Sequence, residues 1–354
     1  MKVLFDHQLF YQSHGGASKY FVMLINSMPR DSWRTTALFS CNEYVKAKKL
    51  FKTYNYHFKG QYRFFDAINR PYTNFCLRRG NFDVFHQTNF GTYCLKSLGR
   101  KPMVTTYHDS NFSTDIDPHP DLVEQQRISL ERADAIICVS NNTKQDMLKY
   151  FDVDENKAHV IYHGIEIPEL DSMDRERIFD FKYILYVGRR NVFKNFVRFI
   201  TAFSLLSRKH PDVKVVCTSD SFSKEEYLLF KELGIENKVV HKYADEETMC
   251  RLYRDAELFV FPSLYEGFGM PILEAWSCRC PIVVSHASCF PEIAADCALY
   301  FDPFDVDDIY EKMLTCLEDS ELRKQLVMKG CMRVKQFSWE KCASEHLKVY
   351  SSLL

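Results

Sequence analysis

Short runs of β-branched and aromatic residues alternate along this chain with longer segments of helical spacing, such as Tyr20, Met23 and Leu24. The runs predict one series of strands at 3–6, 36–39, 84–87, 103–107, 135–139 and 159–162, and a second series at 183–187, 213–217, 238–241, 258–261, 282–285 and 299–301. Strands that alternate with helices form parallel sheets covered on both faces by helices. The pattern therefore predicts an α/β protein with two doubly wound, Rossmann-like domains.

The length supports two domains, because 354 residues exceed the size of about 250–300 residues at which a single core usually splits. The break is predicted near 163–182, where Pro168 and the charged stretch ELDSMDRERIFDFK interrupt the alternation. We expect a first domain at 1–164, a second at 165–336 and a final segment at 337–354. That segment reads as one helix with Ser338 as its N-cap and Glu340 in its first turn. Ligands of open α/β sheets bind beyond the carboxyl ends of the strands, so two facing domains would enclose a cleft between such loops.

Composition excludes several classes of protein. A formal net charge of -1 gives no indication of a nucleic-acid partner, and 46% apolar with 26% charged residues excludes a disordered chain. The 13 cysteines are scattered, odd in number and without a C-x-x-C pair, which predicts reduced core thiols in a cytosolic protein. The N-terminal MKVLF resembles a strand start rather than a signal peptide, and no apolar run is long enough to span a membrane.

The segment 46–65 differs from the rest of the chain. It contains six basic residues and no acidic residue, with Phe and Tyr between them. Basic and aromatic residues together suit the anionic surface of a membrane. The alternative interpretation is a solvated helix and loop with some core aromatics. The sequence leaves both interpretations open.

The run FVFPSLYEGFGMPILEAWSCRCPIVVS is the most informative stretch. The predicted strand 258–261 leads into a loop at 262–270 and then a helix that opens at Pro271. Proline in a first helical turn sacrifices no hydrogen bond, and Gly267 and Gly269 allow close approach of the backbone to a ligand. The free N–H groups at such a helix start form a binding site for a diphosphate.

Two carboxylates flank this helix start. Glu266 lies in the loop, and Glu274 lies about one turn into the helix. A carboxylate accepts two hydrogen bonds in a fork, which matches the vicinal hydroxyls of a ribose or a hexose. The pair could therefore hold a ribose at one end of a diphosphate and a sugar at the other.

Basic residues follow the first strand of the second domain in YVGRRNVFKNF. Gly188 suits a tight turn, and Arg189, Arg190 and Lys194 place three cations beside a helix start. Cations there do not stabilise the helix itself, so a bound anion explains them better. The alternative is a solvated cationic turn, and the choice between Arg189 and Arg190 as the main phosphate ligand stays open.

The first domain offers weaker signals. Gly15 and Gly16 lie between a predicted strand and a helix, but they do not complete a G-x-G-x-x-G fingerprint. His108 and Asp109 directly follow the strand 103–107, where a histidine is as often structural as functional. His86, at the end of another strand, is a weaker candidate for a residue that lines the cleft.

PSLYEGFGMPILEA resembles the E-x7-E signature of glycosyltransferase family 4, a large retaining family with the GT-B fold. The resemblance covers nearly the whole chain and is weakest between about 46 and 79. It implies that Glu274 binds the ribose of a nucleotide-sugar donor and that Glu266 faces the hexose. Amides around Phe268, Gly269 and Met270 would contact sugar and phosphate.

The same resemblance implies roles for other positions. One of the two arginines, with Lys194, would grip the donor diphosphate, and His108 would touch the transferred sugar. Gly15 and Gly16 would line the cleft near the phosphates and the acceptor. Tyr243 to Asp245 would meet the nucleobase, largely through their backbone, and Gly164 would lie in the interdomain hinge.

The implied activity is retaining transfer of a hexose, with mannose from GDP-mannose favoured, to a hydroxyl of a saccharide or lipid-linked saccharide in polysaccharide or lipopolysaccharide assembly. We expect a cytoplasmic enzyme without cofactor or metal, in which cations and helix amides stabilise the leaving diphosphate. Three D-x-D triplets, at 115–117, 152–154 and 305–307, are interpreted as chance occurrences. Two rival functions stay open: a sugar-nucleotide 2-epimerase and a non-catalytic nucleotide-sugar-binding protein.

Overall fold

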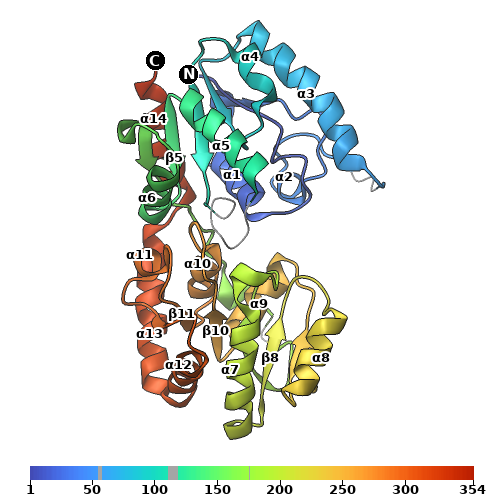
Figure 1. The fold of residues 1–354 in the computed structure, drawn as a ribbon, viewed down its shortest axis with the longest axis vertical. Helices are drawn as coiled ribbons and strands as arrows, with labels where there is room; N and C mark the ends of the chain where they lie inside the picture. The colour runs from blue at the N-terminus through green and yellow to red at the C-terminus, as the bar shows by residue number, and fades with distance from the viewer. Residues whose placement is uncertain (55–57, 111–118, 175) are drawn as a thin grey trace. The chain divides into compact units, whose positions relative to one another are not determined.

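The computed structural model describes residues 1–54, 58–110, 119–174 and 176–354. The chain divides into two compact units, the first of Met1–Gly164 with Ser338–Leu354 and the second of Ile165–Phe337. Each unit has its own parallel sheet with helices packed against it, as Figure 1 shows. The two parallel sheets, one in each unit, confirm the predicted α/β class with two doubly wound, Rossmann-like domains.

The sheet of the first unit has the strand order β2-β1-β3-β4-β5-β6, with every pair parallel. Its strands are β1 (Val3–Phe5), β2 (Trp33–Thr35), β3 (Val84–Gln87), β4 (Met103–Tyr107), β5 (Ala135–Cys138) and β6 (Ala158–Val160). Its helices are α1 (Gly16–Asn26), α2 (Glu43–Ala47), α3 (Gln61–Arg79), α4 (Leu95–Leu98), α5 (Pro120–Arg132), α6 (Asn141–Tyr150) and α14 (Trp339–Ser352).

The predicted strand at 36–39 is wrong, because β2 ends at Thr35. Trp33 pairs with Val3 and Thr35 with Phe5, which places the strand three residues earlier. Beyond it, the amides of Leu38 and Phe39 donate to Oδ1 of Asn69 at 3.0 Å instead of to a neighbouring strand. The Asn69 side chain on α3 therefore satisfies backbone amides that a neighbouring strand would otherwise bind. A partner some thirty residues away cannot be recognised from the local sequence.

The C-terminal helix α14 belongs to the first unit. The Ser338 hydroxyl accepts from the amide of Lys341, as expected for an N-cap. The Tyr20 hydroxyl lies 2.8 Å from Nε2 of His346 and joins α1 to α14. A Cβ at Gly164 would lie 2.2 Å from the amide nitrogen of Trp339, so only glycine fits beside the start of this helix.

The sheet of the second unit has the order β12-β11-β10-β7-β8-β9, again entirely parallel. Its strands are β7 (Lys182–Tyr186), β8 (Val213–Cys217), β9 (Val239–His241), β10 (Leu258–Phe261), β11 (Ile282–Ser285) and β12 (Leu299–Phe301). Its helices are α7 (Phe196–Lys209), α8 (Lys224–Glu232), α9 (Glu246–Asp255), α10 (Met270–Ser277), α11 (Phe290–Ala294), α12 (Val306–Glu318) and α13 (Ser320–Arg333). Apart from β2, the predicted strands agree with the observed ones to within two residues.

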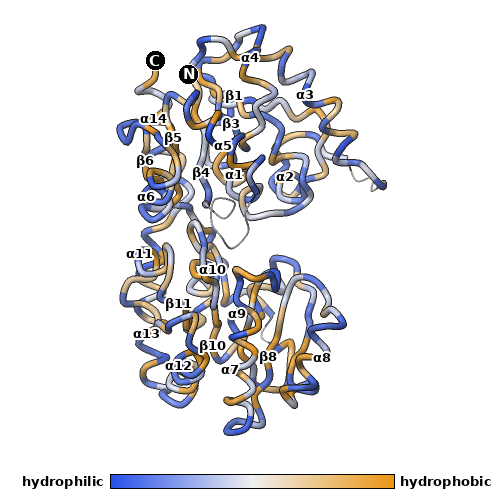
Figure 2. Tube along the Cα trace, viewed as in Figure 1, coloured by the Kyte–Doolittle hydropathy of each residue, from blue (hydrophilic) through white to orange (hydrophobic). Residues whose placement is uncertain are grey.

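Apolar side chains fill both faces of each sheet, as parallel strands require. All four residues of β10 are buried, and Figure 2 shows hydrophobic residues along this strand. All thirteen cysteines lie in the described part of the chain as thiols, and ten of them are buried, in agreement with the predicted core thiols. No helix in that part is both long enough and apolar enough to cross a bilayer.

Candidate functional site

The loop between β10 and α10 leads into a helix start that carries the glycine and the proline predicted there. α10 begins at Met270, one residue before the predicted start, and Pro271 occupies its first turn. Its N-cap, Gly269, has a φ of 88°, a left-handed conformation that favours glycine. A Cβ there would also lie 3.2 Å from the Phe290 ring. The backbone and packing therefore both favour glycine at this helix start.

Glu266 lies in this loop, and its backbone is fixed by Ser288. The Glu266 amide donates to the Ser288 hydroxyl at 3.1 Å, and that hydroxyl donates back to the Glu266 carbonyl at 2.5 Å. Ser288 lies in the loop after β11 and has a φ of 53°. No motif in the sequence points to Ser288. Its only sequence signal is its place in the short stretch HAS that directly follows the buried strand β11.

Lys194 and Glu266 form an ion pair. The Lys194 ammonium, from the 3₁₀ turn η6 (Val192–Lys194) after β7, lies 2.5 Å from Oε1 of Glu266. The two side chains are only 18% and 16% exposed. The Leu264 amide also donates to the Phe193 carbonyl at 2.7 Å, which ties the two loops together. The structure thus brings together two predicted donor-site residues that are 72 positions apart, one assigned to the diphosphate and the other to the hexose.

The two adjacent arginines have different environments. Arg190 is nearly buried and donates from Nε to Glu226 Oε1 at 2.5 Å. Its Nη2 donates to the carbonyls of Asp220 at 2.7 Å and Ser221 at 2.8 Å. Arg189 is exposed, and within the described residues its guanidinium has no ion pair or hydrogen bond. Arg190 therefore fixes the loop after β8, whereas Arg189 is available to a ligand.

Glu274 lies on α10, partly exposed. The buried Tyr253 of α9 donates to its Oε2 at 3.4 Å. The Ser277 hydroxyl donates to the Glu274 carbonyl at 2.8 Å one turn further along the helix. One carboxylate thus lies before the helix start and the other inside the helix, as the sequence predicted.

The loop after β9 has an exposed tyrosine and a capping aspartate. Tyr243 is 75% exposed, and Asp245 caps α9 by accepting from the Thr248 amide at 2.9 Å. Hydrogen bonds from Thr248 hold the pKa of Asp245 below its usual value. The cap occupies Oδ1 of Asp245. β10, β7, β8 and β9 are consecutive in the sheet, so all these loops lie at one edge of it.

In the first unit, Gly15 is the N-cap of α1 and Gly16 begins this helix. Gly16 is exposed, and a Cβ added there would have no atom within 4 Å, so the helix start is open. Asp109, just after β4, is partly exposed. The roles of these three residues stay predictions.

His108 also follows β4, and its Nε2 atom is buried without a hydrogen-bond partner in the described part of the chain. Burial lowers its pKa to about 4, so the imidazole is neutral near pH 7. His86 is different. It is fully buried, and its nitrogens lie 2.6 Å from the Tyr350 hydroxyl and 2.9 Å from that of Thr106. The interpretation of His86 as a residue that lines a cleft is therefore wrong; it is a core histidine.

Two of the D-x-D triplets contain capping residues. Asp154 accepts from the Asn156 amide at the 3₁₀ turn η4 (Glu155–Lys157), and Asp305 accepts from the amides of Asp307 and Asp308 at the start of α12. Capping explains both aspartates without a ligand. The triplet 115–117 lies outside the described residues, as does part of the segment 46–65.

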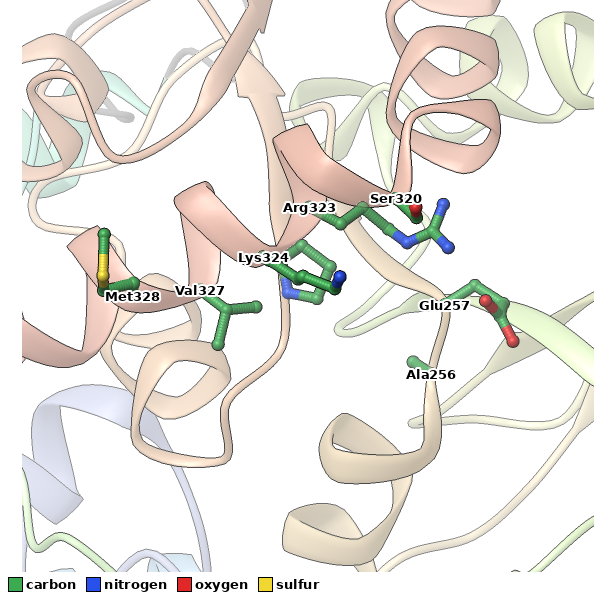
Figure 3. A pocket seen from close by; sticks show the side chains of 8 residues that line it. Ala256, Glu257, Ser320, Arg323, Lys324, Val327 and Met328 are labelled. Carbon is green, nitrogen blue, oxygen red and sulfur yellow. The ribbon is translucent and has the colours of Figure 1, made fainter.

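A pocket of about 420 Å³ lies elsewhere in the second unit. Figure 3 shows Ala256 and Glu257, which precede β10, facing side chains of α13. Because it lies at the amino ends of β10 and β11, this pocket is on the opposite sheet edge from the predicted donor residues.

The fold and these loops define a protein with two Rossmann-like units and a candidate diphosphate site in the second unit. Residues 171–331 match the model of "Glycosyl transferases group 1", and residues 14–168 match that of "Glycosyltransferase Family 4". The O-antigen chain mannosyltransferase B of Escherichia coli is 30% identical over 287 residues, which cover 76% of this chain and 74% of the relative. The chain therefore belongs to the group 1 glycosyltransferases of family 4, and it is a glycosyltransferase.

Other known proteins are similar to this chain. An N-acetylgalactosaminyltransferase from Campylobacter jejuni, whose name specifies a diphospho-undecaprenol substrate, is 30% identical over 68% of this chain and 65% of the relative. Anabaena HepE, solved with UDP and glucose, superposes with a TM-score of 0.81 over 99% of this chain and 100% of that chain, at 18% identity. Sucrose-phosphate synthase from Thermosynechococcus elongatus gives a TM-score of 0.76 at 18% identity, covering 100% and 99% of the two chains. These similarities support the predicted GT-B fold of this chain and carry no statement about its substrates.

Proposed function

We propose that this glycosyltransferase moves mannose, with retention of configuration, from a nucleotide diphosphate sugar to a hydroxyl of a saccharide or lipid-linked saccharide. GDP-mannose is the favoured donor. The choice of sugar is supported by the similarity to the O-antigen mannosyltransferase. The choice of acceptor class is supported by that relative and by the relative named for an undecaprenol-linked substrate.

The observation on which this proposal depends is the Lys194–Glu266 ion pair beside the α10 start. A lysine held against a carboxylate next to a helix start is placed to exchange that partner for a diphosphate. Glu266, released by the lysine, then accepts hydrogen bonds from hexose hydroxyls. Arg189 adds a second cation, and Glu274 binds the ribose hydroxyls.

In the proposed reaction, the sugar–phosphate bond breaks as the acceptor hydroxyl attacks the same face of the sugar, and its proton passes to the leaving phosphate. Lys194, Arg189 and the α10 amides stabilise the charge that develops on the diphosphate, in the role that a metal has in other transferases. His108, neutral at pH 7, orients the hexose through a hydrogen bond. Gly15 and Gly16 permit close approach of substrate to the α1 start.

We place the enzyme in the cytoplasm, where activated sugars are made, with peripheral contact between the segment 46–65 and the inner face of the membrane. Basic and aromatic residues in that segment support the contact.

Product analysis with purified protein tests the proposal. Incubation with GDP-mannose and an oligomannose acceptor should release free GDP and extend the acceptor with an α-linked mannose, detected by mass spectrometry and NMR. Conversion of the donor to another nucleotide sugar without free GDP would indicate a 2-epimerase. Donor binding in calorimetry without any turnover would indicate a binding protein, and a β-linked product would overturn the retaining mechanism.

A further inference from the structure

The helix α3 exposes an apolar stripe on its solvent side. Its buried residues are Gln61, Phe65, Asn69, Thr73 and Leu77. On the other side, Phe64 is 49% exposed and Phe75 is 52% exposed, with the exposed Pro71 between them. Spacings of seven and four residues place these three on one face of a helix. An apolar stripe that faces water along a long helix suggests a binding surface.

Cations lie along the same helix. Arg63, Arg78 and Arg79 of α3 are exposed, as is Lys59 just before it. None of these four forms an ion pair with another described residue. The single acid of α3, Asp66, is already paired with Arg70 at 2.6 Å and with His7 at 3.1 Å. The solvent side of α3 is therefore both apolar and positively charged.

The structure also places the described aromatic residues of the segment 46–65 in different environments. Phe51 packs edge-on against Phe10 at 5.7 Å, and Tyr54 stacks on Phe39 at 4.9 Å, so neither side chain is fully exposed. Phe58 and Tyr62 are 48% and 42% exposed. Among the described residues of this stretch, strongly exposed aromatics therefore start at Phe58 and continue along α3, beyond the end of the predicted segment.

We propose that the solvent side of α3, together with Phe58 and Lys59, is a docking surface for an anionic phospholipid bilayer. The aromatic side chains enter the boundary between headgroups and acyl chains, and the cations lie among the anionic headgroups. Charge complementarity and an apolar stripe on one helix favour this partner over an acidic protein. The inference rests on the proposed function, because a lipid-linked acceptor is held in such a bilayer. Phe58, Lys59 and the exposed side chains of α3 are the groups that would reach the bilayer.

Vesicle co-sedimentation of the full chain tests the surface without donor or acceptor. The wild type should bind phosphatidylcholine vesicles that contain phosphatidylglycerol, bind pure phosphatidylcholine much more weakly, and be released by high salt. The triple change Arg63→Gln, Arg78→Gln and Arg79→Gln should weaken binding on the order of 100-fold, at about fivefold per charge. The double change Phe64→Ser and Phe75→Ser should weaken vesicle binding at least about tenfold, because two aromatic side chains no longer enter the bilayer.

Matched controls come from α8 in the second unit, which also exposes apolar and basic side chains. Two double changes serve as controls: Tyr227→Ser with Leu228→Ser, and Lys224→Gln with Lys231→Gln. Both should leave vesicle binding unchanged. Tyr227 and Leu228 are 57% and 62% exposed, but they lie among acidic residues, which an anionic bilayer repels. Circular dichroism melts check that the α3 variants remain folded.

Several outcomes would overturn the docking surface. One is equal binding of the wild type to neutral and anionic vesicles, and another is full vesicle binding by the α3 variants. A third is a wild type that binds no vesicles but self-associates, with the α3 changes abolishing the self-association. Transfer to a water-soluble acceptor is measured separately. Normal transfer without vesicle binding overturns the docking surface alone, and vesicle binding without transfer overturns the proposed function alone.

Discussion

The ammonium nitrogen of Lys194 lies 2.5 Å from Oε1 of Glu266, and the two residues come from loops after the neighbouring strands β7 and β10. Both side chains are more than four-fifths buried, so each depends on the other for its charge balance. A diphosphate that binds at the α10 start would compete with Glu266 for this lysine. Diphosphate binding would therefore release the Glu266 carboxylate, which we assign to the hexose, from its ion pair with Lys194.

Lys194→Ala should lower kcat/KM for the donor by about 10²–10³, because it removes a cation that stabilises the leaving diphosphate. Initial rates of nucleoside diphosphate release measure this loss. Lys209→Ala is the matched control, since that lysine pairs with Glu318 at 2.8 Å on the surface of the same unit. A loss of less than about threefold for Lys194→Ala would contradict the assignment.

The two neighbouring arginines should give opposite phenotypes. Arg189→Ala should lower kcat/KM with little change in melting temperature, because its guanidinium forms no hydrogen bond or ion pair with a described residue. Arg190→Ala should lower the free energy of unfolding by about 3 kcal/mol or more, since it leaves Glu226 without its partner and removes the ties to the 220–221 carbonyls. Rates and thermal melts of both variants separate the two effects. If Arg190→Ala lowered activity alone and Arg189→Ala lowered stability, Arg190 would be the diphosphate ligand and Arg189 the structural residue.

Glu274→Ala should weaken binding of the free nucleoside diphosphate at least about tenfold, because the ribose loses a forked acceptor. Isothermal titration calorimetry with GDP measures it. Glu257→Ala is a useful control in the same unit, since Glu257 borders the pocket at the opposite sheet edge. Equal affinities for wild type and Glu274→Ala would remove the ribose assignment.

Activity should persist in EDTA, because we assign the stabilisation of the leaving group to cations of the chain and to helix amides. Rates before and after dialysis against the chelator measure this. Abolition of transfer, followed by rescue with Mn²⁺, would show that a metal is required and that the leaving-group assignment is wrong.

Stability should fall as the pH drops from about 6.5 toward 4. His346 is buried, and its Nδ1 donates to the Cys342 carbonyl at 2.8 Å while its Nε2 accepts from Tyr20. Burial lowers the pKa of His346 to about 4, so the unfolded chain binds the proton first. This histidine therefore contributes stability above pH 6.5 that is lost as the pH falls, on the order of 3 kcal/mol by pH 4.

Chemical unfolding of wild type and His346→Gln between pH 4 and 7.5 measures this contribution. The variant should lose less stability on acidification, while His210→Gln, a partly exposed surface change in the second unit, should follow the wild type. Identical slopes for wild type and His346→Gln would contradict the prediction.

Much of the fold could be predicted from local patterns, because apolar runs and helix caps depend on neighbours in sequence. The strands at β3, β4, β8, β10, β11 and β12 coincide with their predicted bounds, and the N-cap role of Ser338 is confirmed. β2 was misplaced because Asn69, some thirty residues away, satisfies the amides that follow it. Side-chain partners from distant segments have no signature in a local window.

The candidate site shows the same division. The sequence by itself determined which residue types follow each strand: a glycine and proline at a helix start, two glutamates, and a cluster of cations after β7. It could not distinguish Arg189 from Arg190, identify Ser288, or show that His86 is a core residue. Only the tertiary structure decided these points, since the environment of a charged side chain depends on which distant groups the fold places within hydrogen-bonding distance.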